Sequence, residues 1–284
     1  MLKLVLLSVV VLVAAMAVLV FCGTLRWQAE TKRLHARLQA ARVQAGIKTY
    51  DPREIAELPA PVQRYFRAVL KTGQPLIAIG RVAHTGTFNM GGNTDQWRPF
   101  TSTQRVTTQS PGFVWDARIR MAPGLTVFVH DAYIAGSGVL VAKLLGLFEV
   151  MAQPSTPELA QGELMRFLAE GPWYPTALLP SQGVRWEALD DTRARATLTD
   201  HATTVTLVVD FDTRGLIRAV HSDGRYRDVD GVQVATPWQG RFWDYELRDG
   251  MRVPLQGEVS WVLPDGPRPY WRGRIQHVAY AYAQ

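Results

Sequence analysis

The alternation of hydrophobic and polar positions divides the chain into an apolar N-terminal segment, a helical region and a long β region. No charged residue occurs from Leu4 to Cys22, a length close to the roughly 20 residues that cross a bilayer as a helix. Residues 24–45 are predicted to form an amphipathic stalk helix, because apolar side chains recur at helical spacing, among them Trp27, Leu34 and Leu38.

Three further helices are predicted on either side of the first group of strands. The segment 59–70 has prolines in its first turn and an apolar face, and 157–170 also begins with a proline. Residues 138–150 are almost entirely apolar, which favours a buried helix. Prolines at 172, 175 and 180 then end any helix.

The rest of the chain has the period of two that is typical of β-strands. Turn residues such as Pro-Gly and Asp-Gly separate about eleven candidate strands. The predicted strands cover 76–89, 96–109, 112–121, 125–135, 184–189, 194–199, 203–211, 216–227, 232–247, 253–263 and 270–283.

A continuous sheet of this size must curl or close, because exposed edges and a bare apolar face are both unfavourable. We therefore expect a mainly β protein with α-helices: a large curved antiparallel sheet or unclosed β-barrel, covered by inserted helices and preceded by one transmembrane helix. The expected organisation is an anchor at 1–23, a helical stalk and linker at 24–57, and a single curved β domain at 58–284 with a helical insertion at about 137–171.

This order of elements resembles the periplasmic lipoprotein-carrier superfamily, which implies an unclosed barrel with helices over an apolar cavity. Three segments, 58–66, 162–170 and 173–180, are also similar to a widespread uncharacterised bacterial family of membrane-anchored proteins. The resemblance implies a fold and a cell-envelope location. It implies no activity.

The distribution of basic residues indicates membrane lipids as a partner. The net charge is +6, but most basic residues are scattered along the strands, which argues against nucleic-acid binding. Basic residues do gather directly after the apolar segment, at Arg26, Lys32, Arg33, Arg37 and Arg42, where membrane lipid head groups would lie.

The apolar segment favours a permanent anchor over a cleaved signal peptide, because its small residues lie inside the run. Phe21 precedes the only cysteine, Cys22, where lipoprotein processing needs a small residue. Trp27 is expected at the level of the head groups. The positive charges after the segment favour a cytoplasmic domain, yet large domains cross membranes largely regardless of charge. We expect the domain on the outer side of the cytoplasmic membrane.

The most polar group in an apolar setting is Glu163, Arg166 and Glu170, which share one helix face. Three interpretations remain open. The group is a solvent-exposed set of ion pairs worth little; or the helix is buried and two carboxylates hold Arg166 for a ligand head group; or the carboxylates catalyse hydrolysis.

Eight of the nine tryptophans follow the stalk and give the domain a large aromatic content, which fills a core or lines a cavity for an apolar ligand. Trp115, Trp173 and Tyr174 join the three charged residues as the predicted ligand-binding set. His130 and Asp131 are adjacent, but alternation places them on opposite faces of a strand. No metal-binding spacing, nucleophile motif or cofactor motif is present, so we expect no cofactor and no metal.

The sequence therefore favours a non-enzymatic, membrane-tethered protein that binds a lipid or another apolar ligand. Two alternatives are a cell-envelope hydrolase that uses Glu163 or Glu170 and a structural subunit of an envelope complex, which would expose a large apolar patch. The sequence indicates no oligomeric state.

Overall fold

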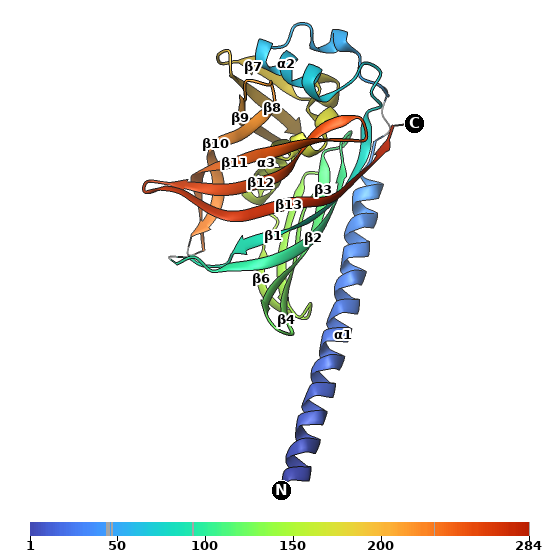
Figure 1. Cartoon of the computed structure of the whole chain (residues 1–284), viewed down its shortest axis with the longest axis vertical. Helices are drawn as coiled ribbons and strands as arrows, with labels where there is room; N and C mark the ends of the chain where they lie inside the picture. The colour runs from blue at the N-terminus through green and yellow to red at the C-terminus, as the bar shows by residue number, and fades with distance from the viewer. Residues whose placement is uncertain (44–45, 47, 93, 230, 284) are drawn as a thin grey trace.

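A computed structural model describes residues 1–43, 46, 48–92, 94–229 and 231–283. Most of the chain forms one curved antiparallel sheet of 13 strands (Figure 1). The helices are α1 (Leu2–Ala40), α2 (Ala60–Val69) and α3 (Pro157–Ala169). Short 3-10 helices are η1 (Pro52–Ile55), η2 (Gly171–Trp173), η3 (Pro175–Leu178) and η4 (Pro180–Gln182).

The strands of the first half are β1 (Ile77–Asn89), β2 (Trp97–Thr107), β3 (Gly112–Ala122), β4 (Leu125–Ile134), β5 (Ser137–Leu144) and β6 (Phe148–Gln153). Those of the second half are β7 (Arg185–Ala188), β8 (Arg193–Asp200), β9 (Thr203–Phe211), β10 (Ile217–Val229), β11 (Val232–Arg248), β12 (Met251–Leu263) and β13 (Gly266–Tyr282). The spatial order is β6-β5-β4-β3-β2-β1-β13-β12-β11-β10-β9-β8-β7, so the first and last strands pair at the centre and β6 and β7 form the edges.

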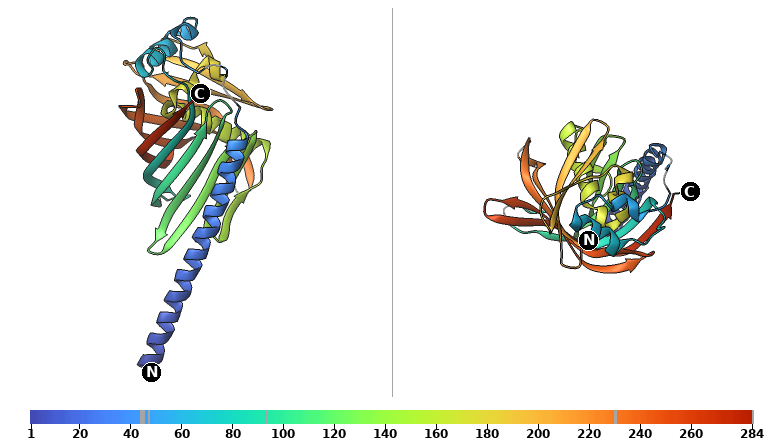
Figure 2. Two further views of the ribbon diagram at one scale, coloured as in Figure 1. Left: turned by 90° about the vertical axis from the view of Figure 1, so that its right-hand side faces the viewer. Right: turned by 90° about the horizontal axis from the view of Figure 1, so that it is seen from above.

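Helix α3 and the 3-10 turns connect the two edges across the concave side of the sheet. The helix packs on β9, β10, β5 and β4, and the curled sheet wraps around it (Figure 2, right). Opposite halves also meet directly, because the Tyr133 hydroxyl at the end of β4 donates a hydrogen bond to the Asp200 carboxylate at the end of β8, at 2.8 Å. The sheet is thus a half-barrel whose opening is partly covered by α3.

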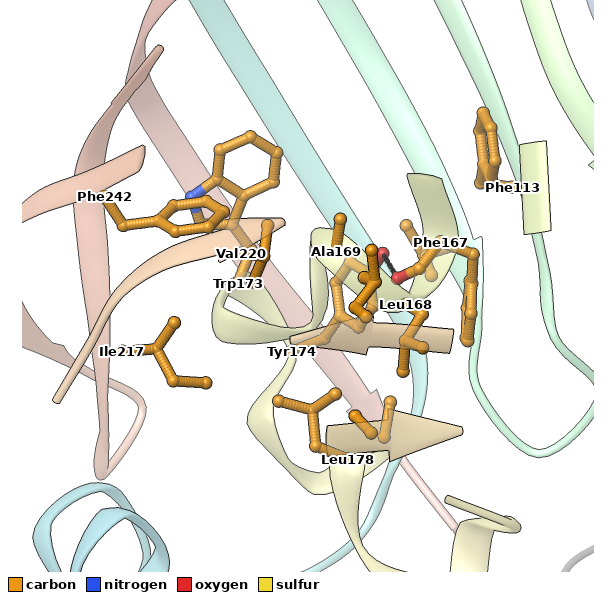
Figure 3. Packing of buried hydrophobic residues seen from close by; sticks show 14 of the residues in the cluster. Phe113, Phe167, Leu168, Ala169, Trp173, Tyr174, Leu178, Ile217, Val220 and Phe242 are labelled. Atoms are coloured by element: carbon orange, nitrogen blue, oxygen red, sulfur yellow. Dashed lines mark hydrogen bonds between the residues drawn. The ribbon is translucent and has the colours of Figure 1, made fainter. Parts of the chain in front are cut away.

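The main hydrophobic core lies between the sheet and the segment that follows α3. Trp173 meets Phe242 of β11 edge to face, with ring centroids 5.8 Å apart, and Tyr174 lies beside Phe167 (Figure 3). The prolines that end the helix keep this segment in tight 3-10 turns that deliver several apolar side chains to one region. This packing fixes the position of α3 relative to the strands.

The predicted anchor and stalk form one continuous helix, because α1 runs without interruption from Leu2 to Ala40. Its second half is packed on the convex face of β2, β3 and β4 (Figure 2, left). Leu34 and Leu38 join Val114 and Ala132 in a small second core. The apolar side of the predicted stalk is therefore the side that packs on the sheet. Positions 44–45 of the predicted stalk lie outside the described residues.

The expectation that Trp27 lies among the head groups is wrong. Its side chain is 0% exposed and stacks on His130 with ring centroids 3.7 Å apart. The indole Nε1 donates to Asp116 Oδ1 at 2.9 Å, and the Thr31 hydroxyl contacts His130 Nε2 at 2.7 Å. Trp27 therefore attaches α1 to the sheet, because the sheet supplies the ring of His130 for stacking and the carboxylate of Asp116 for a hydrogen bond.

The predicted helix at 138–150 is also wrong, since this segment forms β5 and β6. An apolar run of this length fits a strand covered on both faces as well as a helix, and only the turn distinguishes them. Leu145 and Gly146 both have positive φ, 55° and 72°, which ends β5 in a tight turn. The sheet consequently has 13 strands where about eleven were expected, and α3 follows the sixth strand, not the fourth. The helices predicted at 59–70 and 157–170 correspond to α2 and α3.

Candidate functional site

A cavity of about 1230 Å³ lies between the concave face of the sheet and α3. Apolar and aromatic side chains from both halves of the sheet line it, among them Ile119, Val127, Val129, Leu140, Val259 and Trp271. At one end the cavity is bounded by α3 and Trp173, and at the other by residues next to the β1–β2, β10–β11 and β12–β13 turns. The half-barrel therefore encloses a volume that its own side chains do not fill.

Helix α3 supplies the charged wall of this cavity. The Thr156 side chain caps its first turn by accepting a hydrogen bond from the Leu159 amide at 3.2 Å, with Pro157 at the first helical position. With the helix start fixed in this way, Glu163, Arg166 and Glu170 point toward the strands at helical spacing. All three predicted charged residues line the cavity.

Arg166 is held by two carboxylates, but only one of them was predicted. Its Nη1 donates to Asp131 Oδ2 at 2.6 Å, and its Nε donates to Glu170 Oε1 at 2.7 Å. Gln104 accepts from Nη2 at 3.2 Å and donates to Glu170 in turn. The guanidinium also lies over the ring of Trp115, 5.1 Å from its centroid.

This network is not the solvent-exposed set of ion pairs that was one interpretation of the sequence. The Arg166 and Glu170 side chains are 15% and 12% exposed. Alternation did place Asp131 on the face opposite His130, as the structure shows, but the pattern could not reveal that this face meets α3. Gln104 carried no signal at all in the sequence.

Glu163 does not join this arginine. It pairs instead with Arg225 of β10, whose Nη2 lies 3.3 Å from Glu163 Oε1, and the Glu163 side chain is only 3% exposed. Its second oxygen, Oε2, and Asp131 Oδ1 are both buried without a hydrogen-bond donor among the described residues. Burial and the negative charge of Asp131 raise the pKa of Glu163 well above its ordinary value, against the opposing effect of the Arg225 charge. The buried setting thus favours the protonated form of Glu163.

The raised pKa makes stability depend on pH in a defined direction. Because the folded protein holds the Glu163 proton at pH values where the unfolded chain releases it, stability falls as pH rises above about 4.3. Glu163→Gln keeps the hydrogen bonds of the protonated acid and cannot titrate. We expect the free energy of unfolding of this variant to rise relative to wild type between about pH 5 and pH 8, as measured by urea denaturation. Parallel pH profiles of the two proteins would contradict this assignment.

The sequence of this chain matches a family of unknown function, DUF6920, over residues 56–280. The chain belongs to this family. The three segments that suggested an uncharacterised membrane-anchored family lie inside the matched range. No curated protein has significant sequence similarity to the chain.

Solved structures of related shape come from the superfamily that the order of elements suggested. A LolA superfamily protein from Nitrosomonas europaea is 10% identical, with 78% of this chain and 92% of that chain covered and a TM-score of 0.39. A putative outer membrane lipoprotein-sorting protein domain from Vibrio parahaemolyticus is 12% identical, with 72% and 85% covered and a TM-score of 0.38.

The predicted aromatic residues separate into two groups in this family member. Trp115 and Trp173 line the cavity. Tyr174 lies outside the lining, and its hydroxyl donates to the Phe167 carbonyl at 2.8 Å, which ties the end of η2 to α3 (Figure 3). Trp238 and Trp261, which the sequence did not distinguish from other tryptophans, also line the cavity.

Metal binding receives no support from the described part of the chain, where no three His, Cys, Asp or Glu side chains gather to hold an ion. His84 is fully buried between Trp173 and Trp271, and burial lowers its pKa to about 3. It is therefore a neutral part of the core at physiological pH. The chemistry available beside α3 is apolar contact combined with Arg166, Arg225 and the carboxylates that contact them.

Proposed function

We propose that the chain is a membrane-tethered protein that binds a lipid or a similar apolar ligand in the cavity under α3. The observation that carries this proposal is the cavity itself. Its volume of about 1230 Å³ is above the roughly 300–1,000 Å³ of a pocket for a drug-sized molecule, so it has room for a lipid chain. Its aromatic and branched apolar lining suits an acyl chain, since such a surface gains most from contact with hydrocarbon. Both carboxylates of the hydrolase alternative have partners, because Glu170 is bound by Arg166 and Gln104 and Glu163 contacts Arg225.

Helix α1 supports the tether. It is long and apolar enough to cross a membrane, and its N-terminal part projects away from the domain (Figure 1). The packed part begins at Gly23, where a Cβ would lie 1.9 Å from the Leu145 carbonyl oxygen of the β5–β6 turn. Only glycine allows this contact, which fixes the turn directly behind the apolar segment. A membrane around that segment would therefore lie next to the β5–β6 turn.

The end of the cavity away from Trp173 lies at this same end of the sheet. In an antiparallel meander the β1–β2, β3–β4 and β5–β6 turns occupy one end, and the β12–β13 turn joins them because β13 pairs antiparallel with β1. Several residues beside these turns line the cavity, including Asn89, Val150 and Leu263. The arrangement favours a ligand that enters from the bilayer that holds α1.

Filling the cavity should abolish binding without unfolding the protein. Val259 of β12 lines the cavity, so in Val259→Trp the indole would occupy part of the space for the ligand. Native mass spectrometry of the full chain in detergent micelles should show bound lipid for wild type and at least about a tenfold reduction for this variant.

Val262→Trp is the matched control, because this residue lies on the same strand outside the cavity lining. It should bind lipid as wild type does. Equal lipid binding by wild type and Val259→Trp, or no bound lipid in wild type, would overturn the proposed function.

A further inference from the structure

Arg225 differs from Arg166 in how its charge is balanced. Arg166 contacts two carboxylates at 2.6 and 2.7 Å, whereas the one carboxylate of the described residues that contacts Arg225 is Glu163, at the longer distance of 3.3 Å. Glu163 in turn faces Asp131, and two adjacent buried carboxylates share a proton more readily than both ionise. With Glu163 protonated, the positive charge on Arg225 has no anionic partner among the described residues.

The backbone places this arginine in the cavity by a specific device. Val220 and Ser222 of β10 are buried, and strict alternation would next direct Gly224 inward. The register between β10 and β11 shifts between Ser222 and Arg225, which is a β-bulge that adds one residue on β10. The bulge turns Arg225 inward in place of Gly224, and the side chain is then only 11% exposed.

Other charges at this wall do not neutralise Arg225. Arg227, two residues further along β10, also lines the cavity and lies over the Trp261 ring. The lining carboxylates Glu258 and Asp265 are paired with Arg272 and Arg268, respectively. Asp95, Glu158 and Asp228 also line the cavity, but among the described residues only Glu163 lies within ion-pair distance of Arg225.

From these observations we infer that Arg225 binds the anionic group of an amphiphilic ligand, a carboxylate or a phosphate, whose hydrocarbon part fills the cavity. This inference rests on the proposed function and names the class of ligand. The guanidinium offers donors in a planar fork that matches either oxyanion, and its position over the Trp238 ring, 5.2 Å from the centroid, holds it in place. A neutral lipid of the same chain length would leave this buried charge without a partner.

Two pairs of ligands that differ only in charge test the inference on the full chain in micelles. Oleate is compared with methyl oleate, and dioleoyl phosphatidate with dioleoylglycerol, by native mass spectrometry. We expect wild type to bind the anionic member of at least one pair about tenfold or more tightly. The pair that shows the larger preference distinguishes a carboxylate from a phosphate ligand.

Arg225→Gln should remove this preference while it leaves the affinity for the neutral members within about twofold, and Arg225→Lys should retain part of it. Arg218→Gln on the same strand, where the exposed arginine pairs with Asp210 outside the cavity, makes the same charge change and should behave as wild type. Equal binding of neutral and anionic members by wild type, or an unaltered preference in Arg225→Gln, would overturn the inference while the proposed function stands. If wild type binds no member of either pair, the proposed function fails as well.

Discussion

Replacement of Arg166 by glutamine should destabilise the protein by roughly 3–5 kcal/mol, because it leaves the buried carboxylates of Asp131 and Glu170 without their cation. The effect arises from uncompensated charge more than from lost attraction, since a buried ion pair itself contributes little net stability. Urea denaturation of the full chain in detergent measures the loss. Adding Asp131→Asn to this variant should recover part of it, because one of the two unpaired charges is then removed.

An exposed arginine provides the comparison. Arg218 is 63% exposed and lies 3.5 Å from Asp210, so Arg218→Gln should change the free energy of unfolding by less than about 1 kcal/mol. If Arg166→Gln changed the free energy of unfolding as little as this control does, Arg166 would not be what holds the buried carboxylates of the cavity wall in place. Its network would then be an adaptable surface feature.

The second large effect is expected outside the cavity, at the contact between helix and sheet. Trp27→Ala removes a fully buried indole, its stacking on His130 and its hydrogen bond to Asp116, and it should cost roughly 3–5 kcal/mol. Backbone amides in the packed half of α1 should also exchange hydrogen faster, because the helix then leaves the sheet more often.

Two further variants separate the sources of this effect. Trp27→Phe keeps a ring on His130 and loses only the hydrogen bond, so we expect a smaller loss of about 1–3 kcal/mol. Trp243 is 42% exposed, and Trp243→Ala should have little influence on unfolding or on exchange in α1. Unchanged exchange in Trp27→Ala would show that the tether is held to the domain by the other contacts alone.

The period-two pattern was sufficient to predict the sheet and its antiparallel hairpins, and a proline followed by apolar residues was sufficient to predict the helix that begins at Pro157. The prediction failed at 138–150 because this nearly unbroken apolar run has no period of two, and hydrophobicity alone does not separate such a strand from a helix. The helical spacing of Trp27, Leu34 and Leu38 was interpreted as a stalk helix, whereas these residues pack on the sheet. Helical spacing shows that a face is apolar, but the surface that covers it is known only from the fold.

The charged site was predicted on α3 and missed on the strands. Glu163, Arg166 and Glu170 were recognisable because one helix brings them together at steps of three and four. Their partners Asp131 and Arg225 are distant in sequence. Arg225 is turned inward by a β-bulge, and the alternation of the sequence does not predict this bulge. Long-range partners of this kind follow from the curvature and register of the sheet, which sequence spacing does not encode.

The central pairing of β1 with β13 has a consequence for how the chain acquires its structure. Strands β1 to β6 can form a meander as soon as they are synthesised, but the inner edge of β1 stays open until the last residues of the chain arrive. Such late, long-range closure is slow, and an open edge invites pairing with other chains. Attachment of α1 to β3 and β4 can be completed long before that moment. In a nascent chain, α1 would therefore already be packed on the sheet of β1 to β6 before β13 is synthesised and can pair with β1.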